Sequence, residues 1–184
     1  MNAWNGTVDG ELITLQGMHA AEIMNYVTGV IDGTIIAGED RILGCRRFVD
    51  FIKRAAMKDG DIKDGEITMD INPTDADFVI SIIERTYAHR QGESLNAEPM
   101  RGKPFLLEPW EKLCVYGMLI FYHRGTKERL TKEAFIFIPR KNSKTLFASA
   151  LAWALAILQR ASGSVVYVVA ASLKQDMENF NLFV

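Results

Sequence analysis

Apolar residues recur at helical spacing through much of the first half of the chain. Positions three or four residues apart share one face of a helix, and that face can pack on a core. The first such stretch aligns Ile23, Met24, Val27 and Val30, and Gly33 follows it as a candidate C-terminal cap. The pattern predicts three helices, over Glu22–Ile31, Asp40–Met57 and Thr74–His89.

The second and third predicted helices have apolar faces of the same kind. At the start of the third helix, Thr74 and Asp77 have the spacing of a capping box, in which each side chain accepts a backbone N–H. The expected inward positions are Leu43, Phe48, Phe51 and Ile52 in the second helix and Phe78, Ile82 and Ile83 in the third.

The remaining segments of this half are rich in turn-forming residues. Residues 1–19 have no clear period and contain three glycines, so we expect them to be loose or weakly paired. Residues 66–71 alternate weakly between apolar and polar and are compatible with a strand. Residues 91–102 are polar and contain Pro99, which predicts a boundary between a helical, lid-like region of residues 1–100 and a second region of residues 101–184.

The second region predicts an α/β arrangement around a basic loop. A short apolar strand, Phe135–Ile138, leads into the polar loop Pro139–Ser143, and a long apolar helix begins at Lys144. A further β-branched run, Ser164–Ala171, predicts a second buried strand. The expected fold is therefore a helical N-terminal region followed by the start of a P-loop NTPase fold, with an incomplete parallel sheet flanked by helices.

The order strand, turn, Lys-Thr, helix is typical of a phosphate-binding loop. Backbone N–H groups of the turn and the positive end of the helix surround a polyphosphate, a lysine reaches its outer phosphates, and a threonine hydroxyl holds Mg²⁺. Lys144 and Thr145 have these positions, but Ser143 and Ile138 stand where the general motif has glycine. The alternative is a basic loop between a buried strand and a buried helix.

Two segments together resemble the ATPase domain of the large terminase subunits of tailed bacteriophages, the motors that package DNA. The first reads Pro104-Phe105-Leu106-Leu107-Glu108-Pro109-Trp110-Glu111, where the family has a Pro-Phe-x-Leu-x-Pro-Trp-Gln segment that contacts adenine. The second reads Pro139-Arg140-Lys141-Asn142-Ser143-Lys144-Thr145, where the family often has Pro-Arg-Lys-x-Gly-Lys-[Ser/Thr]. The resemblance covers the chain from about Ala20 onward and is most specific over residues 103–145.

The resemblance implies a role for each matching position. Arg140 corresponds to a cis-acting arginine finger and, with Lys144, would stabilise the γ-phosphate during catalysis. Thr145 would coordinate Mg²⁺. The residues implied to contact ATP are Pro109, Trp110 and Glu111 at the base, and Pro139, Lys141, Asn142, Ser143, Lys144 and Thr145 in the loop.

The function implied is ATP hydrolysis that drives duplex DNA into a procapsid. The implied partners are ATP, duplex DNA, the portal protein and the small terminase subunit, with an oligomeric ring in the intact motor and no membrane. The protein would act in the host cytoplasm, transiently at the procapsid portal. A helicase-like ATPase is one alternative, and a non-catalytic P-loop remnant serving as an interaction module is another.

Composition limits these expectations. The formal net charge is -2 and the pI is about 5.9, which is not the charge balance of a duplex DNA-binding domain. The best local basic cluster, residues 124–129, contains Glu128 and predicts a solvated loop. Cys45 and Cys114 lie in apolar helical patterns and are expected to be buried structural thiols.

An ATPase of this type also needs an apolar strand that ends in acidic residues, which hold Mg²⁺ and polarise the attacking water. After Thr145 the only acidic residues are Asp176 and Glu178, and neither ends an apolar strand. The sequence therefore reads as the N-terminal part of a longer protein, truncated before the Walker B strand, with the nuclease domain absent. Alone, it is expected to bind nucleotide weakly at best and to be catalytically inactive.

Overall fold

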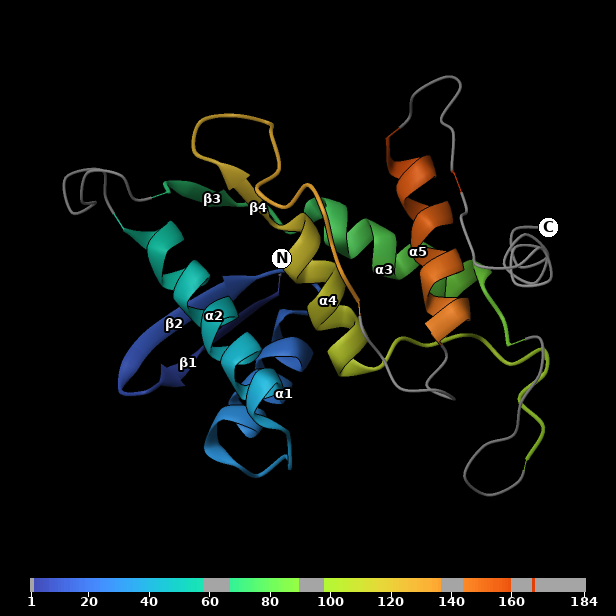
Figure 1. Cartoon of the computed structure of the whole chain (residues 1–184), viewed down its shortest axis with the longest axis horizontal. Coiled ribbons are helices and arrows are strands. Elements are labelled where there is room, and N and C mark those ends of the chain that lie inside the picture. Colours follow the sequence, from blue (N-terminus) through green and yellow to red (C-terminus); the bar gives the residue numbers. More distant parts are fainter. Residues whose placement is uncertain (1, 58–66, 90–97, 137–143, 160–166, 168–184) are drawn as a thin grey trace. The chain divides into compact units, whose positions relative to one another are not determined.

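The computed structural model describes residues 2–57, 67–89, 98–136, 144–159 and 167. Within these residues the fold is mixed α/β, with five helices and two small antiparallel sheets (Figure 1). The chain forms two compact units, each built from two stretches of sequence. The first contains residues 1–77 and 108–134, and the second contains residues 78–107 and 135–184. The predicted division of the chain near residue 100 stays a prediction.

The chain begins with a β-hairpin that the sequence pattern did not reveal. Strand β1 (Ala3–Val8) pairs antiparallel with strand β2 (Glu11–Gln16) over six residues on each side. Asp9 and Gly10 form the turn with φ of 50° and 84°, the positive values that a two-residue hairpin turn requires. Ile13 and Leu15 are buried on one face of β2. The expectation of a loose or weakly paired start was therefore wrong.

The first two predicted helices are confirmed, each with slightly different ends. Helix α1 spans Ala20–Asp32 and helix α2 spans Glu39–Ala56. Gly33 ends α1 in the left-handed conformation, as expected from its position. Leu43 was expected to face inward but is 55% exposed. The buried apolar positions are Ile23, Met24, Val27 and Val30 in α1 and Cys45, Phe48, Val49 and Ile52 in α2.

The second sheet of the first unit joins two short strands that are far apart in sequence. Strand β3 (Met69–Ile71) pairs antiparallel with strand β4 (Phe121–His123), which follows helix α4 (Pro109–Leu119). Phe121 is buried, and the rings of Phe48 and Phe51 meet it edge-on at centroid distances of 5.8 and 5.3 Å. The predicted strand near residues 66–71 is thus confirmed in part, but its partner runs antiparallel.

Helix α3 spans Thr74–Thr86, and so ends before His89, the predicted end. The predicted pairing of Thr74 with Asp77 in a capping box was wrong. The Thr74 N–H donates to the side chain of Asn72 at 3.0 Å, and the Asp77 carboxylate accepts bonds from distant residues instead. The buried residues of α3 are Ala76, Val79, Ile80 and Ile83, whereas Phe78 is 37% exposed.

The Asp77 carboxylate holds the junction between the hairpin and α1. It accepts the Tyr116 hydroxyl at 2.5 Å and the Met18 N–H at 2.9 Å, and the Tyr116 oxygen in turn accepts the His19 N–H at 3.4 Å. Gly17 lies against this hydroxyl with φ of 139°, a conformation that side chains rarely adopt. One buried tyrosine therefore connects segments from four parts of the first unit.

In the second unit, the residues after α3 pair with the segment that precedes residue 108. The Phe105 N–H donates to the Tyr87 carbonyl and the His89 N–H donates to the Lys103 carbonyl, both at 2.9 Å. The Tyr87 ring meets Trp153 of helix α5 (Lys144–Leu158) edge-on at 5.3 Å. The buried residues of α5 are Phe147, Ser149, Ala150, Leu151 and Ala154.

The parallel sheet predicted beside this helix is not found among the described residues, whose two sheets are both antiparallel. Phe135 and Ile136 do not lie in a strand, and Phe135 is 91% exposed, so the predicted strand does not include them. Tyr167, the one described residue of the second predicted strand, is 86% exposed. The rest of both predicted strands lies outside the described residues.

We predict that Gly17→Ala destabilises the protein by at least about 2 kcal/mol, because the positive φ alone costs about 1–3 kcal/mol and a Cβ would meet the Tyr116 hydroxyl. Gly44→Ala is the matched control, since a Cβ there meets nothing within 4 Å and alanine favours a helix by about 1 kcal/mol. Urea unfolding should show opposite signs for the two changes. Equal changes in the free energy of unfolding for the two variants would contradict the close approach of Gly17 to Tyr116.

Candidate functional site

The predicted base-binding segment forms the N-terminus of α4. Glu108 is the N-cap residue and Pro109 occupies the first turn. Proline is tolerated there because the first N–H groups of a helix have no partner within the helix. The Glu108 side chain accepts the backbone N–H of Glu111, and the Glu111 Oε2 accepts the Glu108 N–H at 2.9 Å. The segment Glu-Pro-Trp-Glu thus folds as a capping box built from two glutamates.

Glu111 is almost completely buried, with 2% of its surface exposed. Burial raises the pKa of its carboxyl to about 7, opposed by the hydrogen bond from the Glu108 N–H and reinforced by the negative charge of Glu108. One of its oxygens is committed to the helix cap. The predicted contact of Glu111 with a nucleotide base stays a prediction, and the described role of this residue is structural.

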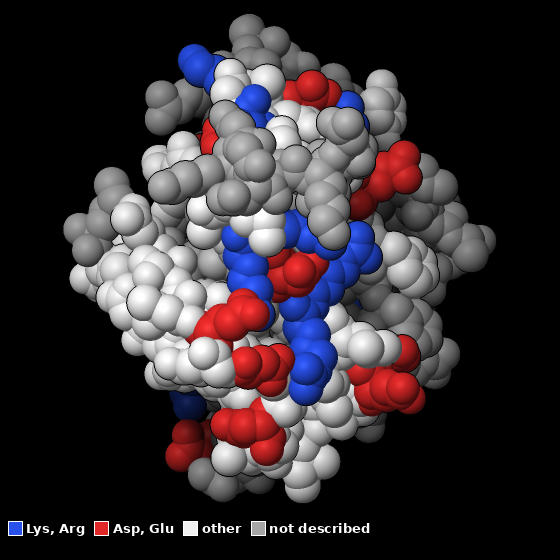
Figure 2. Space-filling view, turned by 90° about the vertical axis from the view of Figure 1, so that its left-hand side faces the viewer, with Lys and Arg blue, Asp and Glu red and all other residues white. Residues whose placement is uncertain are grey.

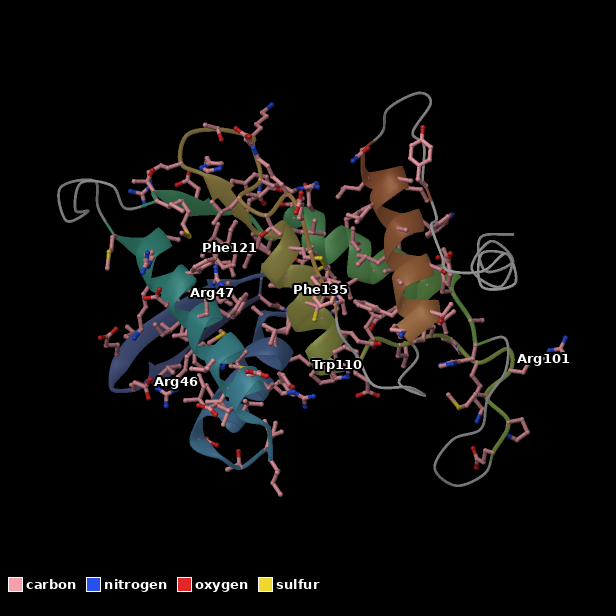
Figure 3. The ribbon with its side chains drawn as sticks, viewed as in Figure 1. Arg46, Arg47, Arg101, Trp110, Phe121 and Phe135 are labelled. Atoms are coloured by element: carbon pink, nitrogen blue, oxygen red, sulfur yellow. The ribbon has the colours of Figure 1, made fainter. Side chains whose placement is uncertain are left out.

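Trp110 lies between these two glutamates, in the first turn of α4, and is half-buried (Figure 3). Together with Pro109 it gives this helix end an apolar and aromatic surface. An aromatic ring of this kind can stack on any nucleic acid base, since every base has a π-face.

Lys144 and Thr145 lie in α5, as the sequence predicted, and are its first two described residues. Both are exposed, and the first turn of the helix contains no acidic residue. The first backbone N–H groups of a helix have no partner within the helix and, with the helix dipole, favour an anion. This helix end has the charge and the hydroxyl that a phosphate and its Mg²⁺ would use. The remaining predicted residues, Pro139, Arg140, Lys141, Asn142 and Ser143, lie outside the described residues.

The predicted site residues that the structure describes therefore form two groups. Pro109, Trp110 and Glu111 lie together at one helix end in the first unit, and Lys144 and Thr145 lie together at another helix end in the second unit. Thr145 offers one hydroxyl as a metal ligand. Among the described residues, no group of three or more His, Cys, Asp or Glu side chains could hold a metal ion.

The basic cluster of residues 124–129 is a solvated loop only in part, because residues 125–128 are exposed but Arg124 and Arg129 are partly buried. A terminal nitrogen of the Arg124 guanidinium donates to the carbonyls of Ala55, Met57 and Met69 at 3.0–3.2 Å. Arg129 forms an ion pair with Asp75 at 2.8 Å. These two cations hold the end of α2, strand β3 and the start of α3 together. Both arginines therefore bind groups of the first unit.

Helix α2 carries further basic residues, but three of them pair with acidic neighbours. Figure 2 shows basic and acidic side chains side by side on one face of the molecule. The ion pairs are Arg46 with Asp9 at 3.1 Å, Lys53 with Glu11 at 2.7 Å, and Arg54 with Asp50 at 2.9 Å. This mixed pattern matches the slightly negative net charge and differs from the one-sign surface of a duplex DNA-binding domain.

Sequence reasoning also missed a charge pair between α1 and α4, in which the lysine is buried and the glutamate is 41% exposed. Lys112 Nζ lies 2.7 Å from Glu22 Oε2, with only 8% of the lysine side chain exposed. His19 Nδ1 approaches the same oxygen at 3.8 Å. The exposed side of Glu22 lets water screen this pair, which limits its contribution to stability. The available signal was Lys112 itself, a charged residue next to the apolar run of α4.

The two cysteines differ in burial. Cys45 is buried, as predicted, whereas Cys114 is only partly covered, and both are free thiols. Burial raises the pKa of the Cys114 thiol to about 11, with the negative charge of Glu111 as the next cause. Burial also raises the pKa of Cys45. Both residues therefore stay protonated at neutral pH and are poor nucleophiles.

Comparison of the chain with protein-family models, with curated proteins and with solved structures finds no match. Within the part of the chain that the structure describes, no helix has the length and apolar character needed to cross a membrane.

We predict that Arg124→Lys lowers the free energy of unfolding by roughly 1–3 kcal/mol. One ammonium group cannot replace both the terminal nitrogen at these carbonyls and the Nε that lies 3.5 Å from Asp70 Oδ1. Lys127→Ala, an exposed change in the same loop, should stay within about 0.5 kcal/mol of the parent. Urea unfolding of both variants makes the comparison. An unchanged Arg124→Lys protein would contradict the need for both guanidinium nitrogens.

We further predict that Glu111→Gln stabilises the protein increasingly as pH rises. The folded state keeps the Glu111 proton up to about pH 7, whereas the unfolded chain releases it near the ordinary glutamate pKa of 4.5. Parent stability therefore falls between these two pH values, because the folded state binds more protons there. Glutamine keeps the cap acceptor and removes the buried charge, so the difference should reach roughly 2–4 kcal/mol above pH 7.

Unfolding free energies of the two proteins at pH 5 to 8 measure this difference. Glu111→Ala is the contrasting variant, because it loses the cap bond as well and should be less stable than Glu111→Gln at every pH. Parallel pH profiles for the parent and Glu111→Gln would contradict the described burial of Glu111.

Proposed function

We propose that this chain supplies the ATP-binding part of a phage DNA-packaging motor, a large terminase subunit. The observation that supports this proposal best is that Lys144 and Thr145 are exposed in the first described turn of helix α5, directly after the basic segment of residues 139–143. A P-loop requires its helix to begin at this lysine. The two segments that resemble the family, residues 104–111 and 139–145, supply the rest of the argument.

In the proposed site, the N-terminus of α5 and Lys144 hold the outer phosphates of ATP, and Thr145 holds Mg²⁺. Arg140 acts as the arginine finger, and Pro139, Lys141, Asn142 and Ser143 complete the loop. Pro109 and Trp110 contact the base. The surrounding parallel sheet of a P-loop NTPase fold is part of the same proposal.

In the intact motor, ATP hydrolysis would drive duplex DNA into the procapsid. The portal protein and the small terminase subunit are the proposed partners, and the working form is an oligomeric ring in the host cytoplasm, transiently at the portal. The sign-mixed surface of the first unit (Figure 2) means that the described residues would not provide the main grip on DNA.

A second candidate is a non-catalytic P-loop module that serves in protein interaction. Two observations favour it: Ser143 replaces the glycine of the loop, and Glu111 is used in the cap of α4. Nucleotide binding that depends on Lys144 would count against this candidate.

We predict that the 184-residue chain binds ATP with Mg²⁺ and that Lys144→Ala weakens binding about tenfold or more, because it removes a charged contact to phosphate worth roughly 1.5–3 kcal/mol. Calorimetric titration measures both affinities. Lys127→Ala, another exposed lysine, is the control and should bind as the parent does. No turnover is expected, since acids after Thr145 are limited to Asp176 and Glu178.

Equal affinity in the parent and Lys144→Ala would contradict the proposed phosphate site. ATP hydrolysis by the chain, lost in Lys144→Ala, would contradict the expectation of binding without turnover.

A further inference from the structure

The first turn of α4 is closed by two carboxyl groups that differ in their exposure to water. The Glu108 N–H donates to Glu111 Oε2 at 2.9 Å, and the Glu108 side chain accepts the Glu111 N–H. Glu108 is exposed, whereas only 2% of the surface of Glu111 is exposed. Ionisation of Glu111 therefore buries a negative charge next to that of Glu108, which is costly without a counter-ion.

The charged groups around Glu111 are engaged elsewhere. Lys112, the next residue, places its ammonium 2.7 Å from Glu22 of α1. The other titratable groups near α4 are Cys114 on the helix itself, His19 and Tyr26 on α1, Arg41 and Cys45 on α2, and Asp77 on α3, which accepts the Tyr116 hydroxyl. Among the described residues, Glu111 takes part in no ion pair.

The rest of α4 is held independently of its first turn. Val115, Tyr116 and Leu119 are buried in the core of the first unit, and Lys112 is 7% exposed. The residues between Glu108 and Glu111 are only partly buried. Opening of residues 108–111 would therefore bring the Glu111 carboxyl to water while the packed part of the helix stays in place.

We propose that the first turn of α4, residues 108–111, is a pH-dependent switch that is closed while Glu111 is protonated and opens when Glu111 ionises. The switch lies in the first unit alone. It does not depend on the proposed nucleotide binding, so the two proposals can fail separately.

The direction of the switch follows from the pKa of Glu111 in its two forms. In the closed turn, burial raises this pKa to about 7, opposed by the hydrogen bond from the Glu108 N–H and reinforced by the Glu108 charge. In the open turn the carboxyl meets water and has the ordinary glutamate pKa of 4.5. The closed form is therefore favoured most at low pH. Opening increases as pH rises from 4.5 to about 7 and then levels off.

Amide hydrogen exchange of the 184-residue chain at pH 5 to 8 tests the switch, with each rate corrected for the pH dependence of exchange in an unstructured peptide. The reporters are the N–H groups of Glu108, Glu111 and Lys112, which all form hydrogen bonds within this turn. We expect their opening equilibrium to increase roughly 30-fold between pH 5 and 7, and about twofold more by pH 8.

Two variants show whether Glu111 is the group responsible. In Glu111→Gln, opening of the three reporters should change less than about threefold over the same pH range, since glutamine does not ionise. Glu39→Gln removes an exposed acid from the first turn of α2 and should follow the parent. A parent whose reporters open independently of pH, or a pH dependence that persists in Glu111→Gln, would overturn the proposal.

The N–H groups of Tyr116 and Leu119, in the packed part of α4, separate local opening from unfolding of the whole unit. They should be protected at least about tenfold better than the three reporters at every pH, because they exchange only when the core opens. Equal protection of the two sets in the parent would mean that Glu111 acts on global stability alone, and would also overturn the switch.

Discussion

The hydrogen bond from the Tyr116 hydroxyl to Asp77 is the interaction on which the first unit most depends. Tyr116 is fully buried, and the two residues together hold the backbone of Met18 and His19. Burial and the Asp77 carboxylate raise the pKa of Tyr116, so its hydroxyl remains a donor. The hairpin, α1, the start of α3 and α4 all meet at this point. Gly17 is required there because the backbone passes directly against the hydroxyl.

Helix α4 therefore combines a structural role with a proposed one in the same eleven residues. Val115, Tyr116 and Leu119 build the core of the first unit, while its first turn carries Trp110 in the segment that resembles a nucleotide-binding motif. The tasks constrain each other, since the polar groups near Trp110 are needed to begin the helix. A ligand at this end would meet an aromatic surface on a rigid helix.

The sequence predicted the parts of the fold that are set by local pattern. The buried faces of α1 and α2 follow from apolar spacing, and the start of α5 follows from the change from a polar loop to an apolar run. The hairpin was missed because the apolar residues of its two strands do not alternate clearly with polar ones, and its turn, Asp9-Gly10, was the main signal. Asp77 had the local spacing of a capping residue, but its partners lie on segments far away in sequence.

The candidate site was predictable in position and less so in chemistry. The motif located Lys144 and Thr145 at a helix start, which the structure has. It could not show that Glu111 turns inward, because burial of a carboxyl depends on how α4 packs. It also could not show that Arg124 binds three backbone carbonyls, since a cluster of basic residues in sequence looks the same whether it faces solvent or a helix end.

Amide hydrogen exchange of the chain with and without ATP and Mg²⁺ tests the central claim most directly. The account predicts slower exchange with nucleotide in residues 139–147, at the start of α5, and in residues 108–112, at the start of α4. The Met18 and His19 amides, held by Asp77 and Tyr116, should exchange alike in both conditions. Unchanged amide exchange at both helix starts, with nucleotide in the millimolar range, would contradict the account.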